Sequence, residues 1–94
     1  MSSLGADFAP RLLRLVGGTA NVSELTHCMA RLRFVLHDDT LADDRAIEAL
    51  PEVVLVVRQS GQLQLVVTVP VTVAHAEVLQ HLAGDSAEKE EETE

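Results

Sequence analysis

Hydrophobic residues near the amino terminus recur at helical spacing. Phe8 is followed one turn later by apolar residues within 12–16, which places them on one face of a helix. Pro10 fits the first turn of such a helix, where its missing N–H would have no partner. The spacing therefore predicts a helix that begins at about Phe8 and ends before Gly17 and Gly18.

The next two segments alternate apolar and polar residues, as half-buried strands do. The first covers residues 22–26 and ends just before Cys28, and the second covers residues 31–36. Because side chains at every second position of a strand lie on the same face, the second strand would present Arg31 and Arg33 together. Its opposite, buried face would consist of Leu32, Phe34 and Leu36.

The middle of the chain predicts a short helix. Residues 38–40 offer side chains that could cap a helix over 42–50, and Pro51 would end it. The apolar residues expected to point inward are Leu41, Ile47 and Leu50.

A hairpin and a last helix complete the pattern. The β-branched run at 53–57 and the alternating run at 63–69 are separated by turn residues at 59–61, which is typical of a β-hairpin. Gln64 would then point away from the apolar face of its strand. A helix is expected over 70–84, opened by its proline and ended by its glycine. Its inward side would consist of Val71, Ala74, Val78 and Leu82.

The predicted order is helix, strand, strand, helix, strand, strand, helix. Paired strands between helices do not build an all-parallel sheet. The fold class is therefore α+β: a four-stranded antiparallel sheet with three helices packed on one face and the other face partly open. Arg31, Arg33 and Gln64 would point to the open face.

Length, charge and composition narrow the class of protein. A chain of 94 residues that is 47% hydrophobic is long enough for one packed domain. It has no apolar run that could span a bilayer and no secretory signal, so a soluble cytoplasmic protein is expected. The net charge is -8, of which -5 falls on residues 85–94, so a domain at 1–84 and an acidic, disordered tail at 85–94 are predicted. The net negative charge and the small number of aromatic residues, only two, argue against nucleic-acid binding.

Cys28 is the only cysteine, and it lies at the end of the first predicted strand. Arg31 and Arg33 are spaced so that both could bracket one anion beside its sulfur, and nearby cations favour the reactive thiolate. A turn after Cys28 could also aim the backbone N–H groups of Met29 to Arg31 at a bound oxyanion. The same residues are compatible with a buried, inert cysteine and two solvated arginines.

Several other chemistries do not fit this motif. A tyrosine phosphatase would need an arginine six positions after the cysteine, where the chain has Phe34. A thioredoxin-like site would need a second cysteine at Arg31. The four histidines lack the spacing of a zinc site, so no metal is expected. His27 could tune the thiolate or move a proton, although a histidine at a strand end is more often simply solvated.

The chain resembles the IIB domain of the glucose/sucrose superfamily of the bacterial phosphoenolpyruvate-dependent sugar phosphotransferase system. The similarity runs from about Leu12 to Leu82. The sequences of its motifs are nearer to those of the sucrose and β-glucoside branch than to those of the glucose branch. The segments that carry it are Leu15-Val16-Gly17-Gly18, Asn21-Val22, Thr26-His27-Cys28, Arg31-Leu32-Arg33-Phe34, Leu50-Pro51 and Ser60-Gly61-Gln62-Leu63-Gln64.

The resemblance implies a phosphotransferase, a protein that carries phosphoryl on cysteine. Cys28 would accept it from a histidine of a IIA protein and pass it to a sugar held by a membrane IIC permease, without a cofactor. Arg31 and Arg33 match the family arginines that hold phosphate and assist onward transfer, and Gln64 matches the family glutamine. Residues in a supporting role would be Thr26, His27, Met29 and Ala30.

One departure from the family pattern concerns the site itself. Ala30 stands where the family usually has a threonine, so the hydroxyl that could donate to phosphate is missing. A degenerate IIB-like binding or regulatory domain without phosphotransfer is therefore the alternative. Because no IIC-like membrane segment is seen in the sequence, a separate subunit is expected that works at the inner face of the membrane when bound to IIC. The sugar would be set by IIC.

Overall fold

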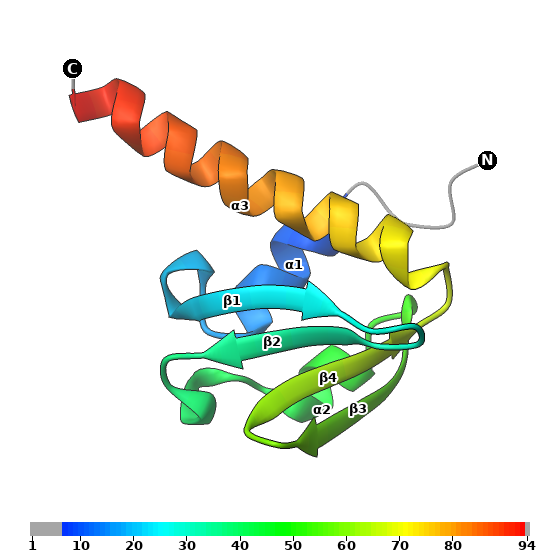
Figure 1. Ribbon diagram of the computed structural model, residues 1–94. Coiled ribbons are helices and arrows are strands. Elements are labelled where there is room, and N and C mark those ends of the chain that lie inside the picture. The colour runs from blue at the N-terminus through cyan, green and yellow to red at the C-terminus, as the bar shows by residue number, and fades with distance from the viewer. Residues whose placement is uncertain (1–6, 94) are drawn as a thin grey trace.

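The computed structural model describes the backbone of residues 7–93 and the side chains of residues 7–84. Three α-helices and four strands follow one another in the predicted order, and two 3-10 turns that were not predicted lie between them (Figure 1). In chain order they are α1 (Phe8–Leu15), η1 (Thr19–Asn21), β1 (Val22–His27), β2 (Leu32–Leu36), η2 (Asp39–Leu41), α2 (Asp44–Glu48), β3 (Val53–Gln59), β4 (Gln62–Val67) and α3 (Val71–Thr93).

The four strands form one antiparallel sheet in the order β1-β2-β4-β3. The helices gather on one face of this sheet, with α3 running along its β1 side (Figure 1). β1 and β2 form one hairpin, β3 and β4 form another, and the two hairpins are joined through β2 and β4. The α+β fold with three helices, predicted from the sequence, is confirmed.

A single hydrophobic core lies between the sheet and the helices. Phe8 and Leu12 from α1, Phe34 from β2 and Val78 from α3 are at most 1% exposed. Alternate residues of β2 and β4 enter this core because successive side chains of a strand point to opposite faces. Full burial of each large apolar side chain contributes roughly 1.5–3 kcal/mol to stability.

Two β-bulges set which side chains face the core. One lies between Val22 and Glu24 in β1, and the other between Val53 and Leu55 in β3. A bulge inserts one extra residue into a strand and so shifts the alternation that follows. The first bulge allows Val22 and Leu25, three positions apart, both to pack against the core.

The predicted boundaries were wrong in two places. The helix expected over 42–50 is shorter, because the chain first makes the 3-10 turn η2, capped by Asp38, and then starts α2 at a cap formed by Asp43. As a result Leu41, predicted to point inward, is 54% exposed. Ile47 and Leu50 are buried as predicted.

The last helix does not end at Gly84 but continues to Thr93. A glycine ends a helix when it takes a left-handed conformation, and Gly84 is not among the glycines with positive φ. Within a helix, glycine costs only about 1 kcal/mol relative to alanine. The backbone of 85–93 is thus helical where a disordered tail was expected, and the division into a domain at 1–84 and a tail at 85–94 stays a prediction.

Asn21 joins the end of α1 to the segments that enter β1 and leave β2. Its Nδ2 donates to the carbonyl oxygens of Val16 at 2.8 Å and Asp38 at 3.0 Å, and its Oδ1 accepts from the Asp38 N–H at 2.9 Å. Gly17 packs directly against this side chain. A Cβ at Gly17 would lie 2.7 Å from Asn21 Nδ2 and 2.8 Å from the Cβ of Leu41.

Gly17→Ala should destabilise the fold more than Gly18→Ala. Both glycines have positive φ, at 108° and 97°, so both substitutions strain the backbone by about 1 kcal/mol or more. Only Gly17→Ala adds the clash with Asn21, which raises its cost to about 2–4 kcal/mol. Urea unfolding of the two variants measures the difference. Equal losses in the free energy of unfolding would contradict the role of Asn21 in linking α1 to the segments beside β1 and β2.

Candidate functional site

Cys28 lies in the tight connection between β1 and β2. Its N–H donates to the Arg31 carbonyl at 3.0 Å, which closes the turn, and its side chain is half-buried. Within this turn the backbone N–H groups of Ala30 and Arg31 hydrogen-bond the sulfur. The Ala30 N–H is the largest of the influences that hold the pKa of the Cys28 thiol below its ordinary value, and together they outweigh the opposing effect of desolvation.

The side chain of Arg33 acts on the same sulfur. Its positive charge and its hydrogen-bonding capacity also lower the pKa of the Cys28 thiol. Arg33 lies across from Thr26 on β1 and Gln64 on β4, so these three residues form a row over the sheet face opposite the helices. The Nε of Arg33 is buried without a hydrogen-bond partner among the described residues, which leaves one donor available to a ligand.

Arg31 has a different role from Arg33. Its Nη1 donates to the Oε1 of Gln59 and to the Oε1 of Gln64, both at 3.0 Å. Gln64 in turn donates through Nε2 to the Oε1 of Gln62 at 3.0 Å. The guanidinium of Arg31 is therefore held by neutral amide groups.

Cys28 and both arginines line one cavity of about 320 Å³. Its other lining residues come from the β3–β4 hairpin and are Gln59, Ser60, Gln62 and Gln64. The cavity thus combines a thiol of lowered pKa, two guanidinium groups and several amides. Guanidinium and amide groups are the side chains best matched to the oxygens of an anion, so this arrangement has the chemistry to hold one against the sulfur.

Gln64 is on the predicted face but is not open to solvent. Only 3% of it is exposed. This face of the sheet was expected to be open. The long polar side chains of Arg31 and Gln62, which hydrogen-bond to Gln64, cover it instead.

The remaining residues singled out from the sequence lie around the cavity rather than in its lining. Thr26 is exposed on the cavity side of β1. His27 pairs with Leu32 and so points to the helix side, where its ring meets that of His75 with 4.7 Å between centroids. Met29 is 97% exposed at the tip of the turn, and Ala30 contributes its backbone N–H.

Sequence reasoning missed Gln59, Ser60 and Gln62. The signal was present, because a Ser-Gly turn with both residues at positive φ makes a two-residue hairpin. Such a turn pairs Gln59 with Gln62, and the period of two puts Gln62 on the same face as Gln64.

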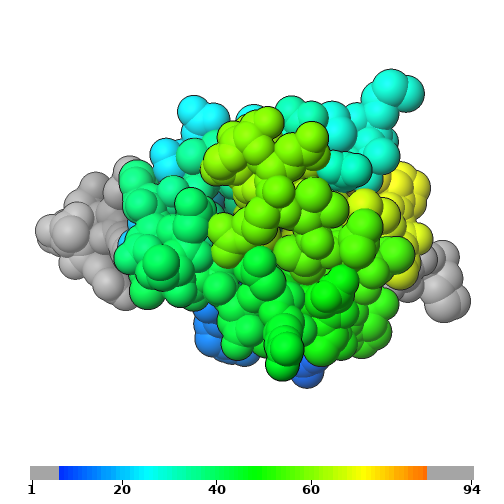
Figure 2. Space-filling model, turned by 90° about the horizontal axis from the view of Figure 1, so that it is seen from below, coloured from blue at the N-terminus to red at the C-terminus, as the bar shows by residue number. Residues whose placement is uncertain are grey.

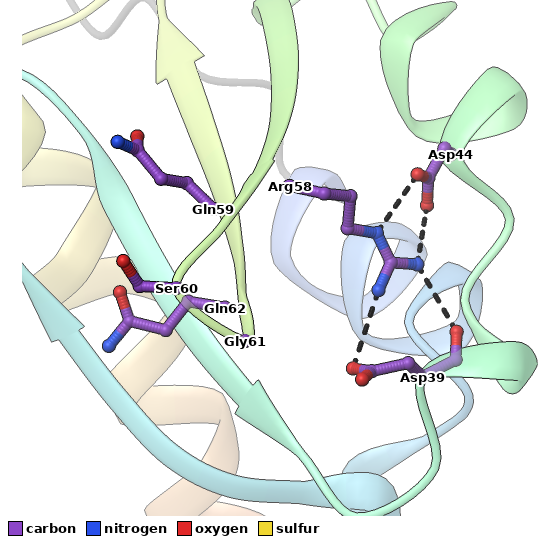
Figure 3. A pocket seen from close by; sticks show the side chains of 7 residues that line it. All are labelled: Asp39, Asp44, Arg58, Gln59, Ser60, Gly61 and Gln62. Atoms are coloured by element: carbon purple, nitrogen blue, oxygen red, sulfur yellow. Dashed lines mark hydrogen bonds and ion pairs between the residues drawn. The ribbon is translucent and has the colours of Figure 1, made fainter.

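A second, larger cavity of about 450 Å³ lies on the other side of the same hairpin (Figure 3). Its charged groups are already paired, since Arg58 contacts Asp44 through two hydrogen bonds of 2.9 and 3.0 Å and Asp39 at 3.3 Å. Asp44 and then Asp39 hold the pKa of Arg58 above its ordinary value. In the view from below, the hairpin (yellow-green) lies near the upper centre, with the segment around residue 40 (green) to its left and cyan atoms of the β1–β2 region on either side of it (Figure 2). Cys28 does not line this cavity.

The described part of the chain contains neither a metal-binding cluster nor a membrane-spanning helix. No three histidine, cysteine, aspartate or glutamate side chains gather there as a metal site would require. None of the helices described is both long enough and apolar enough to cross a membrane.

Comparison with known proteins assigns the family. Residues 11–43, which include Cys28 and both arginines, match the family described as phosphotransferase system, EIIB. A crystal structure of one domain of a phosphotransferase-system IIabc component from Clostridium difficile superposes with a TM-score of 0.69 at 31% identity and covers 79% of this chain and 78% of that one. The chain belongs to the EIIB family of the glucose, sucrose and β-glucoside type.

Two curated relatives of this EIIB domain are much longer proteins. The arbutin-, cellobiose- and salicin-specific EIIBC component of Escherichia coli is 41% identical over 80 residues, which are 85% of this chain and 16% of the relative. The β-glucoside-specific EIIBCA component of Bacillus subtilis is 36% identical over 85 residues, 83% of this chain and 14% of the relative. The chain thus spans about one sixth of these relatives and is a phosphocarrier component of the sugar phosphotransferase system.

Arg33→Gln should raise the pKa of the Cys28 thiol, whereas Arg31→Gln should change it little. The Arg33 side chain stabilises the thiolate by its charge, but Arg31 acts on the sulfur through its backbone N–H, which the substitution retains. Because only the thiolate is alkylated, the rate of iodoacetamide labelling against pH measures this. Arg33→Gln should shift the midpoint to higher pH, and an equal shift in Arg31→Gln would contradict the assignment.

Proposed function

We propose that Cys28 is the residue of this EIIB domain that carries phosphoryl between a IIA protein and a sugar. In the first step the thiolate sulfur attacks the phosphorus of a IIA phosphohistidine, so that an S–P bond forms as the N–P bond breaks and the histidine leaves. In the second step a hydroxyl of the sugar held by IIC attacks the same phosphorus. An O–P bond forms, the S–P bond breaks, the hydroxyl proton passes to water, and the Cys28 thiolate is regenerated.

The observation that carries this proposal is the stabilised thiolate. The same hydrogen bonds and charge lower the pKa of the thiol, and so favour Cys28 both as the nucleophile of the first step and as the leaving group of the second. Phosphoryl transfer depends on positioning and on charge stabilisation rather than on elaborate covalent chemistry. Arg31 and Arg33, which line the cavity with Cys28, would supply the positive charge.

The absence of a hydroxyl at residue 30 does not argue for a degenerate domain. The Ala30 backbone N–H, which any residue but proline would provide, is the strongest influence on the sulfur. Backbone N–H groups of a turn bind oxyanions without help from side chains. The main chain therefore supports phosphate binding where the family threonine is missing.

The names of the relatives support the proposed partners. EIIBC and EIIBCA components contain a C part alone or C and A parts in one chain with the B part. We expect this domain to meet the same two classes of partner, at the cytoplasmic face of the membrane. The matched relatives include proteins named for arbutin, cellobiose and salicin and for sucrose, so the choice of sugar would belong to IIC and not to this domain.

Cys28→Ser should abolish labelling by a phosphorylated IIA domain such as that of the Bacillus subtilis β-glucoside protein. A serine hydroxyl is a poor nucleophile without a general base, whereas the thiolate needs none. Transfer of ³²P to the intact chain, and acid treatment of the product, measure the reaction. A labelled serine variant would exclude Cys28, and an intact chain that takes no label would favour a binding or regulatory domain.

Arg31→Gln and Arg33→Gln should leave labelling of Cys28 partly intact but slow transfer to the sugar at least about 100-fold. Each arginine offsets negative charge on a phosphoryl group whose transfer is mainly an electrostatic problem. Sugar phosphate formed from labelled protein, in vesicles that contain IIC, is the measurement. Sugar transfer at the rate of the unaltered chain would remove the arginines from the mechanism.

A further inference from the structure

We infer that Gln59 is a positioning residue that holds the Arg31 guanidinium in place for transfer of phosphoryl from Cys28, an inference that rests on the proposed function. Arg31 Nη1 lies 3.0 Å from the Oε1 of Gln59 and 3.0 Å from the Oε1 of Gln64. Two acceptors on different strands thus fix one end of a long and otherwise flexible side chain.

The hydrogen bonds occupy only one side of the guanidinium. Both hydrogens of Nη1 are used by the two glutamines, whereas the three N–H groups on Nη2 and Nε have no hydrogen-bond partner among the described residues. Those three include the pair that binds two phosphate oxygens at once. The glutamines therefore hold Arg31 while leaving its phosphate-binding edge free.

The acceptors are neutral, and this matters for the charge of the site. A carboxylate at residue 59 would hold Arg31 at least as firmly but would cancel much of its charge. An amide oxygen restrains the side chain and leaves the full positive charge for the phosphoryl group. By contrast Arg58, the neighbour of Gln59, is paired with Asp39 and Asp44.

Gln59 is itself held by the fold. It is the last residue of β3, just before the Ser60-Gly61 turn, and it pairs with Gln62. Arg58 and Gln59 point to opposite sides of the strand, with Arg58 clamped to Asp44 (Figure 3). The clamp on one side of β3 therefore fixes the backbone from which Gln59 reaches the other side.

The test compares Gln59→Leu with Gln59→Glu and with Gln80→Leu, a matched control at an exposed glutamine of α3. In Gln59→Leu, labelling of Cys28 by phosphorylated IIA should stay within twofold of the unaltered chain, and transfer to sugar should fall about tenfold because Arg31 loses one of its two acceptors. Gln59→Glu should also slow sugar transfer, because its carboxylate would cancel much of the positive charge of Arg31. Gln80→Leu should change neither step.

A second readout separates positioning from a general effect on folding. The ³¹P NMR titration of the phosphorylated chain reports the second pKa of the phosphocysteine, which a nearby guanidinium lowers. Gln59→Leu should raise this pKa, and it should raise it no further in a chain that already carries Arg31→Gln. Unchanged sugar transfer in Gln59→Leu, or an equal effect with and without Arg31, would overturn the inference.

Failure of the proposed function has its own signature, because then the unaltered chain would not be labelled at all. In that case the hydrogen bonds are tested on the unmodified protein by ¹⁵N NMR of the Arg31 guanidinium. Its rotation should be slow in the unaltered chain and in Gln80→Leu, and fast in Gln59→Leu. Fast rotation in the unaltered chain would contradict the positioning role.

Discussion

The site depends on the pairing of β2 with β4, which is the only place where the two hairpins join in the sheet. Cys28, Arg31 and Arg33 belong to the first hairpin, and the three cavity glutamines belong to the second. The register is held by burial, because Leu32, Phe34, Leu63 and Leu65 are fully buried on the core side of this pair. A slip of either strand by one residue would turn its two buried side chains to the opposite face of the sheet, at roughly 1.5–3 kcal/mol each. Packing on one face of the sheet therefore places Arg33 opposite Gln64 on the other.

Irregularities in the edge strands decide which side chains reach the cavity. After the bulge in β1, Thr26 shares the face of Arg33, and His27 turns to the helix side toward His75. After the bulge in β3, Gln59 shares the face of Gln62, and Arg58 turns toward α2. A single inserted residue in either strand is enough to exchange neighbouring side chains between the two faces. The bulges are thus part of the architecture of the site.

Three arginines near the hairpin tips illustrate how the environment sets the use of a charge. Arg33 acts on the Cys28 sulfur, Arg31 is held by neutral amides, and Arg58 is neutralised by two aspartates. Only the first two line the cavity that contains the thiol. The positive charge available to a phosphoryl group is therefore concentrated beside Cys28, although the chain as a whole carries a net charge of -8.

Local pattern by itself determined the order of elements, the α+β class and the motif around Cys28, because strand alternation, helical spacing and turn residues act between near neighbours in the chain. It also indicated that Arg31, Arg33 and Gln64 share a face. Helix ends were less well determined: Gly84 does not stop α3, and Leu41 lies in a 3-10 turn. The tertiary structure alone decided that Gln59 contacts Arg31, that Gln64 is buried, and that the Ala30 N–H meets the sulfur. These contacts depend on strand register, bulges and the conformation of a tight turn, which arise from packing across the whole sheet rather than from neighbouring residues.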